Sequence, residues 1–188
     1  MLGAALAVCC GSVSFLQRLK SETHQAHLDL EKAMPLGQPD LNLTGYGRAL
    51  QAFSAVVPAL EQRLLALPFP PEFQVASGVR AASLIEDLRV LGLEAASPSR
   101  AWDTLTLDEG LGALYVLEGS RLGGAIIARS LPPLGLSDTH GASYFAVTPD
   151  LSPRWKNFQA ALERQADKQT APTPQQSSRG QKQLLAPS

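Results

Sequence analysis

The stretch EGLGALYVLEGSRLGGAIIARSL, residues 109–131, decides the fold class, because it is a strongly apolar helical sequence that contains five glycines. Thr106 and Glu109 have the spacing of a capping box, and two prolines follow Leu131, so a helix is expected from about 106 to 130. Each glycine in a helix interior costs about 0.5–1 kcal/mol relative to alanine. A helix that accepts this cost several times indicates that something approaches its backbone closely.

Two explanations fit the glycines. Gly112, Gly119 and Gly123 are separated by seven and four residues, which places them on one face of the helix. Either a second helix packs closely against this face, as Gly-x-x-x-Gly patterns permit, or a flat ligand lies on the exposed peptide groups. This segment alone leaves both explanations open.

The rest of the chain also favours helices, and no stretch alternates between apolar and polar residues over the length of a strand. The sequence therefore predicts an all-α protein with several long helices around one core. Residues 1–13 are expected to be poorly ordered, residues 14–166 to form a helical domain, and the Gln/Ser/Pro-rich residues 167–188 to be a disordered tail. The other predicted helices span 14–34, 44–67 with a kink at Pro58, 72–91 with a possible break near Gly78 and a stop at Gly92, and 152–165.

Composition excludes some classes of function. The chain has 188 residues, a net charge of −1 and a pI near 6.3, so no basic surface for nucleic acid is expected. No uninterrupted apolar run approaches the roughly 18 residues of a membrane span, and no membrane association is expected. Cys9 and Cys10 are adjacent and unsuited to a structural disulfide, which favours a reducing, cytoplasmic compartment.

Two of the three histidines lie in the stretch LKSETHQAHLDLEKAM, residues 19–34. At 100° per residue His27 falls in the middle of an apolar stripe, which is expected to be the buried face of the helix, whereas His24 lies about 60° away, near the border. The stripe consists of Leu16, Leu19, Thr23, His27, Leu30 and Met34.

His27 has two interpretations from this pattern alone: a core histidine with a hydrogen-bond partner, or a ligand. Glu31, four residues later, is in reach of its ring N–H, as the carboxylates behind metal-bound histidines are. Lys20 lies on the same side and suits an anionic group at the edge of a cofactor. A metal chelate of His24 and His27 lacks further ligands, because His140 falls in a predicted loop.

These segments together resemble the heme oxygenase family. LKSETHQAHLDLE resembles its proximal helix, and LYVLEGSRLGG resembles the distal helix of the bacterial, biliverdin-producing branch. GASYF, residues 141–145, is also similar to that branch, and the likeness runs in order from about Leu16 to Leu162. The resemblance implies a heme oxygenase-like bundle in which haem lies between the proximal and the distal helix.

On the proximal side, the resemblance implies that His27 is the axial ligand of the haem iron. Glu31 would be its hydrogen-bond partner, and Lys20 would pair with a haem propionate.

On the distal side, the resemblance implies that Gly119 and Ser120 take part in catalysis and that Gly119, Gly123 and Gly124 line the haem. Animal members of the family carry an aspartate where this chain has Ser120, a neutral hydroxyl that can hold a water molecule. We therefore expect a different network for proton delivery.

The implied reaction converts haem, O₂ and external electrons into biliverdin, CO and Fe²⁺, with haem as both cofactor and substrate. The electrons would come from a ferredoxin or a flavoprotein reductase. The implied purpose is iron release, or biliverdin for a bacterial phytochrome.

Two other functions stay open. After about Gln165 the chain no longer resembles the family's final helix. A protein without that helix could be a non-catalytic haem carrier or sensor. A helical interaction module, in which the glycines pack against a partner helix, is the third hypothesis.

Overall fold

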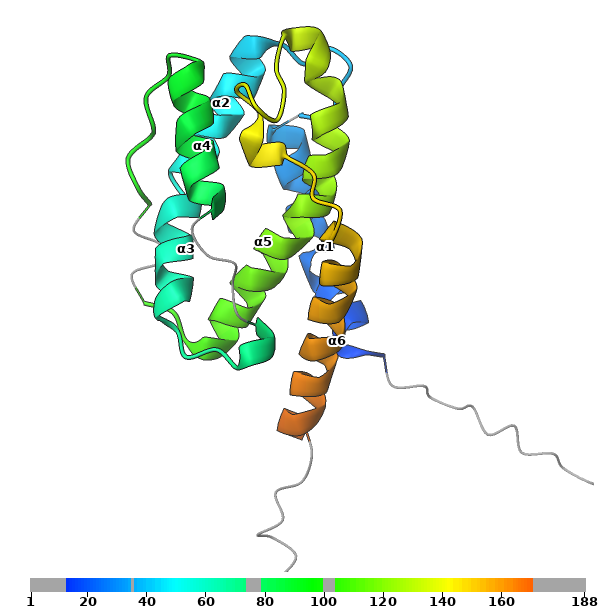
Figure 1. Cartoon of the computed structure of the whole chain (residues 1–188). Helices are drawn as coiled ribbons and strands as arrows, with labels where there is room; N and C mark the ends of the chain where they lie inside the picture. Colours follow the sequence, from blue (N-terminus) through cyan, green and yellow to red (C-terminus); the bar gives the residue numbers. More distant parts are fainter. Residues whose placement is uncertain (1–12, 35, 74–78, 100–103, 171–188) are drawn as a thin grey trace, which may run out of the picture.

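The computed structural model of the chain describes residues 13–34, 36–73, 79–99 and 104–170. Within these residues the protein is all-α, as predicted, with no strand beyond isolated bridges around Ser137. The helices are α1 (Phe15–Ala33), α2 (Leu43–Ser54), α3 (Val57–Ala66), α4 (Val79–Val90), α5 (Leu107–Ile127) and α6 (Leu151–Thr170), and the short 3₁₀ helices are η1 (Pro71–Phe73), η2 (Ala128–Ser130), η3 (Pro132–Leu134) and η4 (Ser143–Phe145) (Figure 1).

Local sequence signals set most helix ends. Both predicted capping boxes are present: the side chain of Ser14 accepts from the backbone N–H of Gln17, and Thr106 does the same for Glu109. α4 ends in a Schellman motif, in which Gly92 has φ +66° and the N–H of Leu93 donates to the carbonyl of Leu88. Only a residue that tolerates positive φ fits at that position.

Three of the predicted helices differ from those in the structure. The single helix expected over 44–67 is two helices, because Pro58 has no N–H to donate and occupies the first turn of the new helix α3. The helix expected over 72–91 is η1 followed by α4, and residues 74–78 between them lie outside the described residues. α6 continues to Thr170, beyond the expected end near Gln165.

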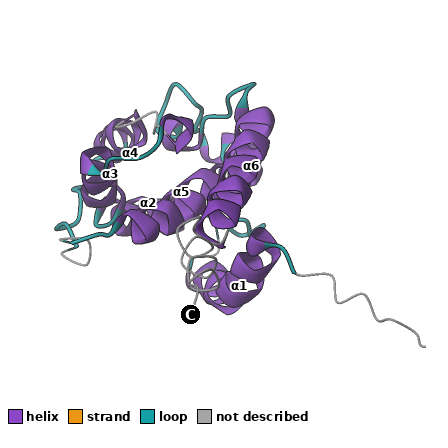
Figure 2. Cartoon of the chain, turned by 90° about the horizontal axis from the view of Figure 1, so that it is seen from below, coloured by secondary structure: helices purple, strands orange, loops and turns teal. Residues whose placement is uncertain are grey.

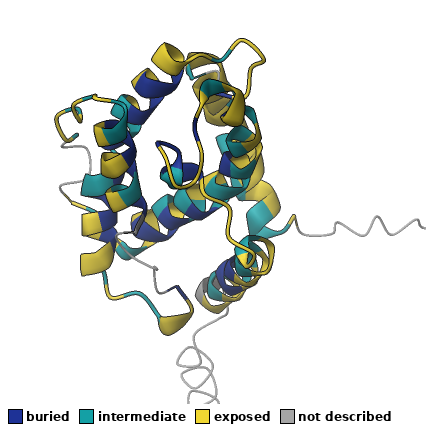
Figure 3. Ribbon diagram, turned by 45° about the horizontal axis from the view of Figure 1, so that its top comes forward, coloured by how far each residue is buried: buried dark blue, intermediate teal, exposed yellow. Residues whose placement is uncertain are grey.

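Two apolar clusters form the core. One lies among α2, α4 and η4 and includes Tyr46, Leu50 and Leu84, which are fully buried. The other lies among α3, α5 and α6 and includes Leu64, Leu114 and Phe158. α5 contacts both groups, and the buried residues gather where the helices face one another (Figure 3).

α1 is attached mainly at its beginning. Phe15 and Leu16 pack against the second cluster, and the N–H of Leu16 donates to the carboxylate of Glu163 on α6. The helix contains no buried residue, and seen from below it lies apart from the other helices (Figure 2). At its other end Met34, the C-cap residue, packs against the first cluster, so the exposed part of α1 is the turn between, which carries His27 and Leu30.

α5 with η2, Leu107–Ser130, is long and apolar enough to be a candidate membrane span by length and composition, with a mean hydropathy of 1.2. The sequence has no uninterrupted apolar run of about 18 residues and predicted no such segment. α5 contacts α3, α6 and η4, and it carries Glu118 and Arg121, which are paired with each other inside the protein. These are properties of the central helix of a bundle.

Candidate functional site

A cavity of about 410 Å³ lies between the second half of α1 and the second half of α5. This volume is within the range of small-molecule sites. Its lining combines apolar side chains with a few polar groups from segments far apart in the chain. These residues are His27, Leu30, Glu31, Met34, Leu36, Gly37, Gln38, Phe53, Arg80, Ser120, Gly123, Gly124, Ile126, Ile127, Tyr144 and Phe145.

The face of α1 that the sequence marked as buried lines this cavity. His27 is 70 % exposed and Leu30 is 51 % exposed, so the prediction that this stripe is buried is wrong. The periodicity identified the apolar face correctly, but periodicity cannot say whether another element covers that face. Here the second half of α1 faces a cavity instead of a packed helix.

Glu31 lies where the sequence placed it relative to His27. Its Oε1 is 3.3 Å from Nδ1 of His27, one helical turn away. If Nδ1 carries the ring proton and donates it to Glu31, Nε2 of His27 has a free lone pair for a ligand.

The other two sequence-selected residues of α1 do not line the cavity. Lys20 and His24 are both exposed. Within the described part of the chain, no three His, Cys, Asp or Glu residues come close enough to hold a metal ion.

The glycines of α5 have different neighbours. A Cβ atom on Gly123 would meet no atom within 4 Å, and the same holds for Gly112, outside the cavity. A Cβ on Gly124 would lie 3.1 Å from the ring of Phe145. At Gly119 it would lie 3.3 Å from Trp155 of α6, and Gly119 is not a lining residue. Helix packing therefore explains Gly119, whereas open space surrounds Gly123.

Ser120 lines the cavity, and its hydroxyl both donates and accepts a hydrogen bond within the protein. The hydroxyl donates to the carbonyl of Leu117 at 2.8 Å, one turn earlier, and accepts from Nη1 of Arg80 at 3.0 Å. Arg80 also donates to the Leu117 carbonyl at 2.9 Å, and its guanidinium lies 4.5 Å from the centre of the Tyr144 ring.

η4 forms one wall of the cavity, and Asp87 of α4 fixes η4 in place by hydrogen bonds. This carboxylate is 1 % exposed, and it accepts hydrogen bonds from the backbone N–H groups of Ser143 and Tyr144 and from the hydroxyl of Ser143. Burial raises the pKa of the Tyr144 phenol above its ordinary value.

Arg80 and Asp87 were not predicted from the sequence as residues of the site. Their signal was available, since both are charged residues in a helix whose other face is apolar, but such residues are usually solvated. Only the fold shows that both are buried against η4 and α5.

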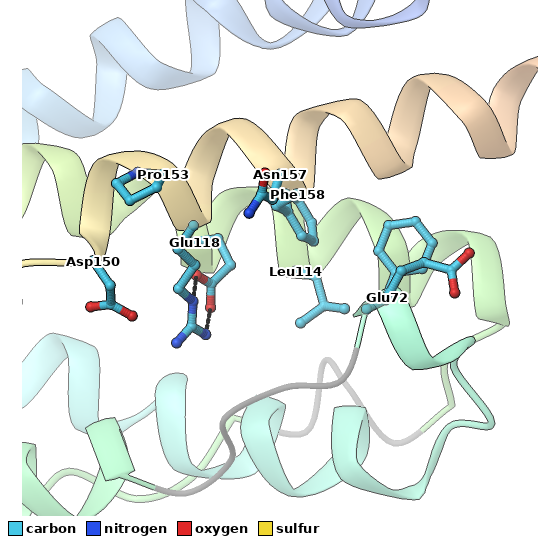
Figure 4. Close-up of a pocket in the computed structure, with 9 residues that line it drawn as sticks. Glu72, Leu114, Glu118, Asp150, Pro153, Asn157 and Phe158 are labelled. Carbon is cyan, nitrogen blue, oxygen red and sulfur yellow. Dashed lines mark hydrogen bonds and ion pairs between the residues drawn. The ribbon is translucent and has the colours of Figure 1, made fainter.

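A charged cluster lies on the other side of α5, outside this cavity. Glu118 forms a bidentate ion pair with Arg154 of α6, at 2.9 and 2.8 Å, and Nε of Arg121 lies 3.6 Å from the same carboxylate. Burial lowers the pKa of the Arg121 guanidinium. The pair between Glu118 and Arg154 lines a second cavity of about 330 Å³ between α5 and α6 (Figure 4).

Comparison with known proteins places the chain in a family. No family model matches it. It is 34 % identical over 133 residues to a heme oxygenase of Xanthomonas campestris pv. campestris, covering 68 % of this chain and 78 % of that protein. It is also 30 % identical over 154 residues to the heme oxygenase PigA of Pseudomonas aeruginosa, covering 78 % and 76 %. The chain belongs to the heme oxygenase family.

The two relatives confirm the family expected from the sequence, and the helices of the structure confirm the expected all-α fold. For this heme oxygenase-family protein, the cavity between α1 and α5 is the candidate site. It brings together His27, Glu31, Ser120, Gly123 and Gly124, whereas Lys20 and Gly119 lie outside its lining. The roles that the sequence assigned to these seven residues stay predictions.

Proposed function

We propose that the protein degrades haem oxidatively and that haem binds between α1 and α5. One observation carries the proposal: His27 of α1 and the glycine backbone of α5, far apart in the chain, line one cavity in a member of the heme oxygenase family. The similarity to two proteins named heme oxygenase supports the reaction class.

The residues at the cavity fit a haem group. Leu30, Met34 and Phe53 offer apolar contacts for a macrocycle. The open space at Gly123 leaves room for a flat ligand close to the peptide groups of α5. His27 is exposed toward the same space, and imidazole is a common axial ligand of haem iron.

When bound, haem supplies an iron that binds O₂ and accepts external electrons, and its macrocycle is the substrate that becomes biliverdin, with release of CO and Fe²⁺. The protein's own residues would then do the following. His27 would hold the iron through its imidazole, and Glu31 would orient that imidazole by accepting a hydrogen bond from Nδ1–H. Gly123 would leave space for the macrocycle beside α5, and Gly124 admits the ring of Phe145 to the same wall of the cavity.

The remaining sequence assignments belong to the same proposal. Lys20 is exposed on α1, so it is free to reach a haem propionate at the edge of the site. Gly119 packs against α6 and contributes through its backbone, next to the hydroxyl of Ser120.

The reaction needs electrons from a separate protein, which we propose to be a ferredoxin or a flavoprotein reductase in the cytoplasm. A bacterial phytochrome is the proposed acceptor of biliverdin when chromophore supply, and not iron release, is the purpose.

The test uses hemin and the purified protein. Hemin is expected to give a Soret band, and ascorbate or reduced ferredoxin under air is expected to convert the complex to biliverdin, followed by its absorbance. His27→Ala should remove the axial-ligand spectrum, and His24→Ala, a histidine of the same helix outside the cavity, should leave it intact.

Each outcome separates the hypotheses. A Soret band without bile pigment would indicate a haem carrier or sensor. Absence of a band in the wild-type protein would leave the helical interaction module as the remaining hypothesis. Loss of the spectrum in His24→Ala but not in His27→Ala would reverse the ligand assignment.

A further inference from the structure

Arg80 is a buried cation on the wall of the cavity, and neither the family resemblance nor the reaction assigns it a role. It lies on α4, is 6 % exposed, and lines the cavity together with Ser120 and Gly123. Removing a guanidinium from water costs free energy unless its N–H groups and its charge have partners in the protein. Its contacts therefore indicate what the position is for.

Part of the guanidinium is occupied by α5 and η4. Nη1 donates to the carbonyl of Leu117 at 2.9 Å and to the hydroxyl of Ser120 at 3.0 Å, and the Tyr144 ring packs at 4.5 Å. These contacts fix the guanidinium in position beside the second half of α5.

The other part is available. A guanidinium has five N–H groups, and those on Nη2 and Nε make no hydrogen bond to another residue of the described chain. Glu61 of α3 is close enough to interact with the charge of Arg80, but its carboxylate accepts from the N–H of Ala81 at 3.1 Å and forms no ion pair with Arg80.

Ser120, in contrast to Arg80, has no hydrogen-bond donor left for a ligand. A serine hydroxyl has one proton, and here that proton is donated to the carbonyl of Leu117, within the same helix. Since Ser120 also accepts from Arg80, its remaining capacity is as an acceptor. In this arrangement Ser120 cannot donate to a molecule in the cavity, whereas Arg80 can.

We propose that Arg80, and not Ser120, is the hydrogen-bond donor for a small, negatively charged ligand held in the cavity opposite His27. The inference rests on the proposed haem site, because the ligand in question is one that binds the iron on its open side. Ser120 then acts as a positioning residue that holds Arg80.

The experiment compares two ligands of the ferric hemin complex. Fluoride is an anion that accepts hydrogen bonds, and imidazole is neutral and binds mainly through its nitrogen. Arg80→Met is expected to raise the Kd for fluoride about tenfold or more, because a charge-assisted hydrogen bond is lost, and to change the Kd for imidazole by less than about twofold. Arg80→Lys should restore part of the preference for fluoride.

Two further variants complete the comparison. Ser120→Ala should change the fluoride affinity by less than about threefold, since its proton is committed to Leu117. Arg89→Met is the matched control: Arg89 lies on the same helix but is exposed and paired with Glu86, and it should have no effect. If Arg80→Met does not fold, Arg80→Gln, which keeps a donor and removes the charge, is measured in its place and should also lose fluoride affinity.

The outcomes distinguish this inference from the proposed haem site. Absence of a Soret band in the wild-type protein would overturn both. Equal loss of affinity for fluoride, imidazole and hemin in Arg80→Met would overturn the inference alone and indicate a contact to a haem carboxylate or a role in packing. A larger effect of Ser120→Ala than of Arg80→Met would return the donor role to Ser120.

Discussion

The two halves of α5 both contain glycines, but the neighbours of these glycines differ. Gly119 and Gly123 are one helical turn apart, yet Gly119 faces the ring of Trp155 on α6, and Gly123 faces open space in the cavity. The packed side is secured by the ion pair between Glu118 and Arg154. A Gly-x-x-x-Gly pattern therefore does not have a single cause, since one glycine admits a packed helix and the next borders open space in a cavity.

The largest expected effect concerns the packed side of α5. Glu118→Ala leaves Arg154 and the half-buried Arg121 without their carboxylate and should lower the free energy of unfolding by about 3 kcal/mol. Urea denaturation measures this loss. Glu86→Ala, which breaks the exposed pair with Arg89, is the control and should leave the urea midpoint unchanged. An equal loss in both variants would show that burial of the Glu118 cluster is not what matters.

The next effect concerns the wall of the open side. Asp87→Ala removes the acceptor of two backbone N–H groups and one hydroxyl in η4, and should lower the free energy of unfolding by about 2 kcal/mol. Because Tyr144 and Phe145 line the cavity, hemin affinity should also fall. Thermal unfolding and a hemin titration measure the two losses. Lost stability with wild-type hemin affinity would show that η4 does not shape the site.

Alanine at single glycines tests the comparison most directly. Gly123→Ala should raise the stability of the hemin-free protein by about 0.5–1 kcal/mol, because the helix gains propensity and the Cβ meets no atom, and it should weaken hemin binding. Gly112→Ala is the matched control, with the same open surroundings outside the cavity, so stability should rise while hemin affinity stays constant.

Gly119→Ala completes this series. Its Cβ would lie 3.3 Å from Trp155, so the indole must shift, and we expect a smaller gain in stability than for Gly112→Ala. Differential scanning calorimetry ranks the three variants. A loss of hemin affinity only in Gly119→Ala would place the haem nearer α6 than the cavity does.

The smallest expected effect is a pH dependence near Arg80. Burial is the largest influence on Glu61 and raises the pKa of its carboxyl above the ordinary 4.5, although Arg80 and Arg121 act in the opposite direction. The folded state therefore binds this proton more tightly than the unfolded state, and stability falls as the pH rises from 4.5 through the raised value.

Glu61→Gln removes this titration and keeps an oxygen to accept from Ala81. Its unfolding free energy, measured by urea denaturation from about pH 4 to about pH 7, should therefore gain on the wild type as the pH rises. Parallel stability profiles for the two proteins would contradict the raised pKa.

Much of the fold could be predicted from the sequence, because its signals are local. The capping boxes of Ser14 and Thr106 and the stop at Gly92 are set by residues within one or two turns of each other. Pro58 was also a local signal, but its effect was underestimated: without an N–H it ended one helix and began another.

The candidate site was predicted only in part. The sequence identified His27, Glu31, Ser120 and the glycines, and the fold brings most of them to one cavity. The sequence did not identify Arg80, because the position of this residue depends on the packing of α4 against α5 and η4.

By itself the sequence determined that the protein is helical, where most of its helices begin and end, and which face of α1 carries His27. Only the tertiary structure decided whether that face is covered, which of two similar glycines is open, and that a buried arginine donates a hydrogen bond to Ser120. The physical reason is range: caps and periodicity act within a few residues of the chain, whereas exposure and hydrogen-bond partners depend on segments that only the folded chain brings together.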